Sequence, residues 1–163
     1  MLVTIVLSIL LMIALFGMIY AIATLIQSKK LMATAPKDIQ EAALDHPERF
    51  KGSHILGWSL MIVCVMIYPI AFIYGTYDGL KNGYSFLQFF VRFLMMLWLM
   101  KAFDIIFIDY YILSKSHFFQ HYFPETEGCK GYRQFGFNRK EQLGQIILFP
   151  FIALALAFIC TLL

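Results

Sequence analysis

The fold is decided by residues 85–113, SFLQFFVRFLMMLWLMKAFDIIFIDYYIL, a stretch long enough to cross a lipid bilayer as one helix. It is strongly apolar, yet it contains four charged residues: Arg92, Lys101, Asp104 and Asp109. A charge at membrane depth costs roughly 2.5–3.5 kcal/mol on insertion scales, so it needs a partner, a route to water or a function. These four charges are therefore the main clue to what the protein does.

The composition of the whole chain agrees with a membrane protein. Of 163 residues, 61% are apolar and 14% are charged, whereas about 25% of the residues in soluble domains are charged. The three cysteines, Cys64, Cys129 and Cys160, are scattered and form no C-x-x-C pair, which excludes a disulfide framework and a thiol oxidoreductase. We expect the lipid bilayer as the main partner, and no nucleic acid.

Long apolar runs predict four membrane-spanning helices within a single membrane domain, residues 1–163. The predicted spans are residues 2–26, 56–77, 85–113 and 145–163. The first run is longer than the apolar core of a signal peptide and has no basic segment before it, so we expect it to be retained as an anchor. Pro69 should kink the second span.

Two long connections, residues 27–55 and 114–144, separate these spans. Pro36 followed by acidic residues indicates the start of a short helix, and a second short helix should begin at Pro47. We expect both to lie at the membrane surface. The predicted fold class is all-α: four transmembrane helices, with short cytoplasmic interfacial helices between spans one and two.

The distribution of basic residues predicts the orientation in a cell membrane. Ten of the 13 Lys and Arg residues lie in the two long connections, and the short turn between spans two and three holds only Lys81. Loops rich in Lys and Arg stay in the cytoplasm. Both long loops should therefore be cytoplasmic and both termini outside.

The charges of the third span allow two interpretations. Lys101 and Asp104 are three residues apart, the spacing of a side-by-side pair, and Tyr111 falls on the face of Asp104. In the plainer interpretation they form an interfacial salt bridge, and the long stem of Arg92 reaches outward to the interface. In the sharper one, Lys101, Asp104 and Asp109 form the inner mouth of a polar pathway and Arg92 lies near its outer mouth. Both require side chains that face protein rather than lipid.

The second long loop contains a different set of chemical groups. His117 and His121 have the i, i+4 spacing of two metal ligands on one helix face, followed by Glu125, Glu127 and Cys129. The alternative is a pair of interfacial histidines near lipid headgroups. We predict no other cofactor.

Three motifs carry a resemblance to a known group. They are Phe103-Asp104-x4-Asp109-Tyr110, Phe123-Pro124-Glu125-Thr126-Glu127-Gly128 and Gly131-Tyr132-x3-Gly136-Phe137. They resemble small bacterial four-span membrane proteins with an Asp-x4-Asp span end and a Pro-x-Thr-Glu-Gly loop, a group without an assigned activity. The resemblance implies a bacterial origin and points to Asp104, Asp109, Glu127 and Tyr132.

Three functional hypotheses follow. We favour a non-enzymatic, oligomeric bundle that binds or passes a small solute, ion or lipid through Arg92, Lys101, Asp104 and Asp109. The second is a membrane enzyme acting on a lipid-like substrate at the cytoplasmic face, with its site in the His117–Cys129 loop. The third is an assembly or regulatory subunit that pairs with another membrane protein.

Overall fold

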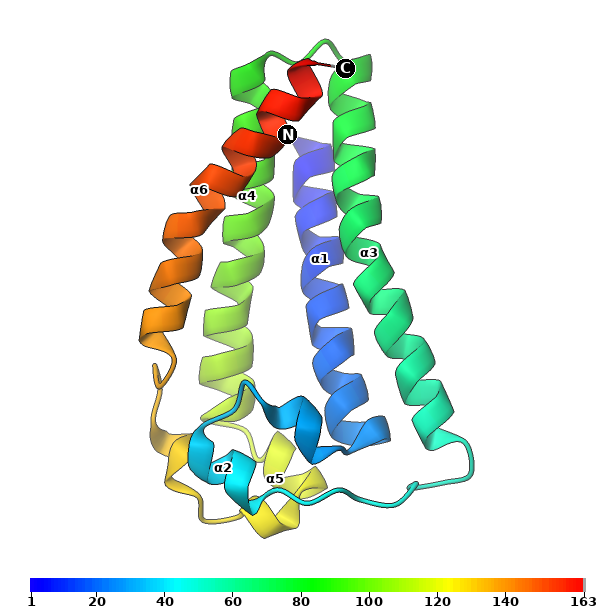
Figure 1. Cartoon of the computed structure of the whole chain (residues 1–163), viewed down its shortest axis with the longest axis vertical. Coiled ribbons are helices and arrows are strands. Elements are labelled where there is room, and N and C mark those ends of the chain that lie inside the picture. The colour runs from blue at the N-terminus through cyan, green and yellow to red at the C-terminus, as the bar shows by residue number, and fades with distance from the viewer. Residues whose placement is uncertain (163) are drawn as a thin grey trace.

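A computed structural model describes residues 1–162, and these residues are 78% helical with no strands among them. Four long helical rods lie side by side (Figure 1). They are α1 (Leu2–Tyr20) continued by η1 (Ala21–Ile26), α3 (Ser53–Lys81), α4 (Phe86–Phe103) continued by η3 (Asp104–Leu113), and α6 (Arg139–Thr161). The all-α prediction is therefore confirmed.

The bundle has two different ends. At the turn end, residues 82–85 join α3 to α4, and the start of α1 and the end of α6 lie toward this end (Figure 1). The other end, which we call the loop end, carries both long connections. Helix α1 contacts both α3 and α4, and α6 packs on α4. The rods diverge toward the loop end (Figure 1).

Five short helices form a layer under the loop end, which we call the cap. They are η2 (Lys29–Met32), α2 (Lys37–Ala42), α5 (Phe118–Tyr122), η4 (Pro124–Thr126) and η5 (Lys130–Arg133). Ile39 of α2 and Phe123, which lies between α5 and η4, are fully buried in a cluster that includes residues of η1 and η3. The cap thus joins the two connections into one apolar cluster beneath the rods.

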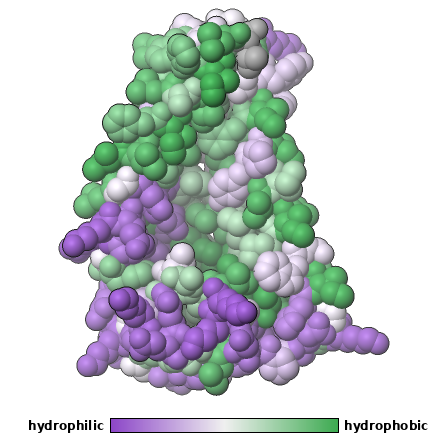
Figure 2. All heavy atoms as spheres, viewed as in Figure 1, coloured by the Kyte–Doolittle hydropathy of each residue, from purple (hydrophilic) through white to green (hydrophobic). Residues whose placement is uncertain are grey.

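Three helices are long and apolar enough to cross a membrane: Leu2–Ile26, Ser53–Lys81 and Arg139–Thr161. Their outward faces expose large apolar side chains, among them Ile13 and Ile147. Figure 2 shows that hydrophilic residues gather toward the loop end while most of the surface above them is hydrophobic. A long apolar surface of this kind fits a lipid environment.

Two details of the connections differ from the sequence-based expectations. Helix α2 follows Pro36 as predicted, but no helix begins at Pro47, and residues 43–52 form an irregular strap. The backbone N–H of Leu44 donates to Glu125 and that of His46 donates to the carbonyl of Gln27. These contacts hold the segment that leads into Pro47 against other parts of the chain.

The ends of the long helices also differ. Helix α6 begins at Arg139, so its first turns hold polar residues that were assigned to the loop. Helix α3 continues through Pro69, and its axis changes direction part-way along (Figure 1), as the predicted kink requires.

Two π-helical segments were not foreseen from the sequence. Both η1 and η3 continue an α-helix into the loop end, and η3 is 10 residues long. Such segments are rare and occur often at functional sites. Their wider turns change which residues of η3 face the bundle, including Asp109.

Candidate functional site

A cavity of about 320 Å³ lies within the loop end, which we call the loop-end cavity. Small-molecule sites range over roughly 300–1,000 Å³, so it is large enough for a small ligand. Residues from all four rods line it. Its polar residues include Lys101, Asp104, Asp109, Asn138, Glu141 and Gln142. Its apolar residues are Leu15, Met18, Ile19, Ile22, Met61 and Ile108.

The first polar element is the predicted pair of Lys101 and Asp104. The ammonium Nζ of Lys101 donates to Asp104 Oδ2 over 2.7 Å. The Lys101 side chain is 8% exposed and that of Asp104 is 24% exposed, so the pair is partly shielded from solvent. Because one helical turn separates them, the two charges neutralise each other locally.

The second polar element is Asp109, which is buried in η3. Its Oδ2 accepts hydrogen bonds from the side-chain amides of Gln142 and Asn138, the latter over 3.3 Å. Gln142 is 7% exposed and lies in the first turn of α6, and Asn138 is the residue that precedes this helix. Asp109 therefore fixes the start of α6 against η3.

Sequence reasoning missed Asn138 and Gln142. The fourth span was expected to begin at residue 145, which left both residues in a loop of unknown course. Their i, i+4 spacing just before an apolar run was the available signal, because it places two amides on one helix face. Asp109 as their partner follows only from the tertiary fold.

Arg92 lies away from this cavity, toward the turn end. Its guanidinium donates to the carbonyl of Gly75 over 2.5 Å, to Asp78 Oδ2 over 2.7 Å and to the Tyr84 hydroxyl over 2.8 Å. It also lies 4.3 Å from the centre of the Tyr84 ring. Its stem was expected to reach the interface; instead Arg92 is only 2% exposed and is paired within the protein.

Tyr111 does not join the charged residues. Its side chain is 54% exposed, and its ring stacks on Phe107 at 5.7 Å between centroids. It is not among the residues that line the loop-end cavity. The π-helical course of η3 accounts for this, because the predicted face assumed α-helical geometry through residue 113.

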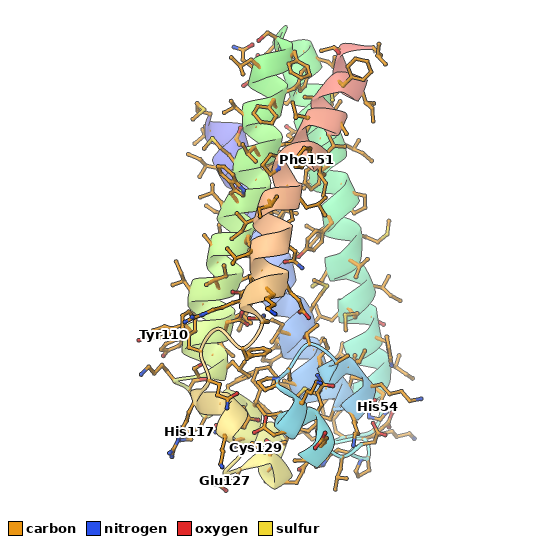
Figure 3. All side chains as sticks on the ribbon, turned by 60° about the vertical axis from the view of Figure 1, so that its left-hand side comes forward. His54, Tyr110, His117, Glu127, Cys129 and Phe151 are labelled. Atoms are coloured by element: carbon orange, nitrogen blue, oxygen red, sulfur yellow. The ribbon has the colours of Figure 1, made fainter. Side chains whose placement is uncertain are left out.

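The residues of the Pro-x-Thr-Glu-Gly loop hold the cap together. Glu125 lies 3.0 Å from His46 Nε2 and accepts a hydrogen bond from the backbone N–H of Leu44. The buried Thr126 hydroxyl lies 2.6 Å from the hydroxyl of Tyr132. Glu127 is exposed and lies at the outer surface (Figure 3). The contacts of Glu125 join the two connections, and the contact between Thr126 and Tyr132 lies within the second one.

Three groups in the cap have shifted pKa values. Burial raises the pKa of Tyr132 to about 12. Burial also raises the pKa of the Cys129 thiol, with Asp38 adding to the shift, so this cysteine is a poor nucleophile at neutral pH. For Glu125, burial acts to raise the pKa, but the hydrogen bonds from Leu44 and His46 outweigh it, and the pKa is below the usual value.

His117 and His121 lie on the outside of the cap. Both are exposed, and α5 begins directly after His117. His117, Glu127 and Cys129 are seen at the loop end in Figure 3. Within residues 1–162, no group of three or more His, Cys, Asp or Glu side chains is arranged to hold a metal ion. The structure therefore gives the two histidines no further ligand.

Compared with protein-family models, with curated proteins and with solved structures, the chain gives no match. A function for this protein must therefore come from the chemistry of its own residues.

Proposed function

We propose that the chain is a four-span protein of a bacterial cell membrane that binds a small polar or amphiphilic molecule in the loop-end cavity. The observation that carries the proposal is this cavity, in which buried Lys101 and Asp109 meet an apolar wall built by α1, η1 and α3. Small-molecule sites commonly combine a mostly apolar lining with a few placed polar groups.

The fourth span of the proposal is the rod formed by α4 and η3. Its two segments are 18 and 10 residues long, which together exceed the about 20 residues that a span needs. Three of its four charged residues are paired within the protein, Arg92 with Asp78 and Lys101 with Asp104, and the fourth, Asp109, is hydrogen-bonded to Asn138 and Gln142. Pairing inside the protein is the usual arrangement of charges at membrane depth.

We further propose that the loop end faces the cytoplasm and that both termini lie outside. The ten Lys and Arg residues of the two long connections support this orientation. The cap would then lie at the cytoplasmic interface, and the loop-end cavity would open within the inner half of the membrane. An amphiphile could reach such a cavity with its polar part near the headgroups.

Binding is a better proposal than passage through one copy of the chain. Above the cavity, the turn end is filled by an apolar cluster that includes fully packed Phe89, Phe93 and Met96. A polar solute would have to cross this apolar cluster. Passage would require a path shared between copies in a homo-oligomer.

A cavity-filling variant tests the proposal. The change Ile19→Trp places a large ring in the loop-end cavity, whereas the matched change Ile13→Trp on the same helix adds the same ring at a side chain that is 60% exposed. Both proteins would be purified in native lipid discs, and their bound small molecules compared by mass spectrometry.

We expect a molecule that co-purifies with the native chain and with Ile13→Trp, and that is reduced about tenfold or more in Ile19→Trp, because loss of roughly 1.4 kcal/mol of binding is a tenfold change. Equal retention by the two variants would contradict the proposed site.

A further inference from the structure

The charges that line the loop-end cavity do not balance. One basic side chain, Lys101, faces three acidic ones, Asp104, Asp109 and Glu141. Lys101 and Asp104 neutralise each other at 2.7 Å, and Glu141 is exposed at the start of α6. Asp109 is 9% exposed, and its two partners, Gln142 and Asn138, are neutral amides. Its buried carboxylate thus lacks a cationic partner among residues 1–162.

The surroundings of Asp109 also supply too few hydrogen-bond donors. Both amides reach Oδ2 of Asp109, and no donor from the described chain reaches its other oxygen, Oδ1. The side-chain oxygen of Asn138 is buried without a partner as well. Asn138 contacts Asp109 directly, so the two oxygens without a donor belong to neighbouring side chains. A buried acceptor such as the Asn138 oxygen normally has a donor.

The lack of a cation and the lack of hydrogen-bond donors beside Asp109 together indicate which class of ligand would fit there. An anion would be repelled by Asp109, and the one cationic side chain of the cavity lining, Lys101, is already paired with Asp104. A divalent cation would need several oxygen ligands, whereas the amide groups of Gln142 and Asn138 turn N–H toward Asp109. A protonated amine supplies a positive charge together with up to three donors.

The apolar lining of the cavity indicates the kind of group to which the amine is attached. Leu15, Met18, Ile19 and Met61 present an apolar wall opposite the polar side. Methionine side chains adapt to ligands of irregular shape. An apolar body would therefore be buried together with the charged end.

We infer that the loop-end cavity recognises a protonated amine carried on an apolar body, with the ammonium between Asp109 and Asn138. The inference rests on the proposed function and names the ligand class of the same site. The amine has two sources: the headgroup of an aminophospholipid, or a free alkylamine from the cytoplasm.

Three probes of equal chain length test this inference: dodecylamine, dodecanol and dodecanoate. Each would be added to the full-length protein in phosphatidylcholine discs, and the bound fraction measured by native mass spectrometry. The Ile19→Trp protein supplies the background from partition into lipid. We expect cavity-dependent binding of dodecylamine to be about tenfold tighter or more than that of the other two, because a charge-assisted hydrogen bond contributes on this order.

Two variants test whether the preference for dodecylamine depends on Asp109. The change Asp109→Asn should abolish the preference for the amine, whereas Glu127→Gln, which removes an exposed carboxylate of the cap, should leave it unchanged. A second change, Gln142→Lys, brings a tethered ammonium next to Asp109. It should also abolish dodecylamine binding, and it keeps the test valid if Asp109→Asn fails to fold.

The outcomes separate the two levels of the claim. Cavity-dependent binding of all three probes with equal affinity would overturn the amine inference and leave the proposed function standing. Absence of any cavity-dependent binding would overturn both. A preference for the amine supports the inference, and repeating the experiment with phosphatidylethanolamine in the discs then identifies the source. Weaker probe binding there indicates the lipid headgroup, and unchanged binding indicates a free amine.

Discussion

At the scale of single residues, the charges of the α4–η3 rod have different roles. Arg92 is held by Asp78, Tyr84 and the carbonyl of Gly75, and it fastens α4 to the end of α3. Lys101 and Asp104 neutralise each other within one helix. Asp109 alone has no charged partner in the described chain. The first two arrangements pair charges within the protein, and the third is the one that our inference assigns to a ligand.

The role of Arg92 leads to a stability prediction. The change Asp78→Asn leaves a guanidinium that is 2% exposed without its counter-charge. We expect the free energy of unfolding in mixed micelles to fall by about 3 kcal/mol, as for other broken buried pairs. The control is Lys81→Gln, an exposed charge one turn further along α3. Equal effects of the two changes would show that the pair contributes little.

Part of this residue chemistry was predictable. The i, i+3 spacing of Lys101 and Asp104 was sufficient to predict their contact. The partners of Arg92 and Asp109 were not predictable, because they come from other helices. Asp78 was assigned to a surface turn, and Gln142 to a loop. Both assignments depended on helix ends, which apolar runs locate poorly when polar residues begin or end a helix.

At the scale of elements, the cap depends on polar contacts between its two connections. Glu125 accepts hydrogen bonds from the strap at Leu44 and His46, and Asp38 accepts one from the backbone N–H of Gly131 over 2.7 Å. Gly128 has a φ of +88°, a conformation that L side chains rarely adopt, and it ends the turn after Thr126. The Pro-x-Thr-Glu-Gly motif therefore supplies a contact between the two connections, through Glu125, and a turn, through Gly128.

The lowered pKa of Glu125 predicts how the cap responds to pH. A carboxyl whose pKa is lowered by folding stabilises the cap fully above its unfolded pKa, and this stabilisation is lost as the pH falls through the folded pKa. Its contacts should contribute roughly 1–2 kcal/mol. Acidification through this range should therefore open the cap and expose Cys129.

The labelling rate of Cys129 with a pyridyl disulfide, a reagent active at acidic pH, measures this opening. We expect the rate to rise as the pH falls in the native chain. In Glu125→Gln it should already be high at neutral pH and change little. The Glu127→Gln protein should behave as the native chain. If the labelling rate of Cys129 changed neither with pH nor on the change Glu125→Gln, the proposed role of Glu125 in closing the cap would be refuted.

The long helices were predicted well from the sequence, whereas the π-helical segments and the irregular strap were not. Long helices follow from runs of apolar residues, and all four rods were expected near their observed positions. The π-helical course of η1 and η3 has no signal in the apolar pattern. The irregular strap at residues 43–52 was not predicted either, because it is held by contacts with distant segments. The exposed position of Tyr111 is a consequence of the first, and the wrong expectation of a helix at Pro47 is a consequence of the second.

At the scale of the whole molecule, the described chain consists of a helical bundle and a cap, with a cavity at the loop end. The rods diverge toward the loop end (Figure 1). The loop-end cavity lies there, and the cap adds an apolar cluster at this end. The sequence predicted charged groups at one end of the third span. It could not predict the cavity, because a cavity depends on how four helices diverge.

The central claim is that the α4–η3 rod crosses the membrane and carries Asp109 into the inner half. Single cysteines at Asn82 and at Glu127, in a chain whose three native cysteines are replaced by alanine, test this most directly. Intact cells would be treated with a thiol reagent that does not cross membranes. We predict labelling at position 82 and none at position 127 until the cells are opened. Labelling at both positions, or at neither, in intact cells would put the two ends of the rod on one side and contradict the account.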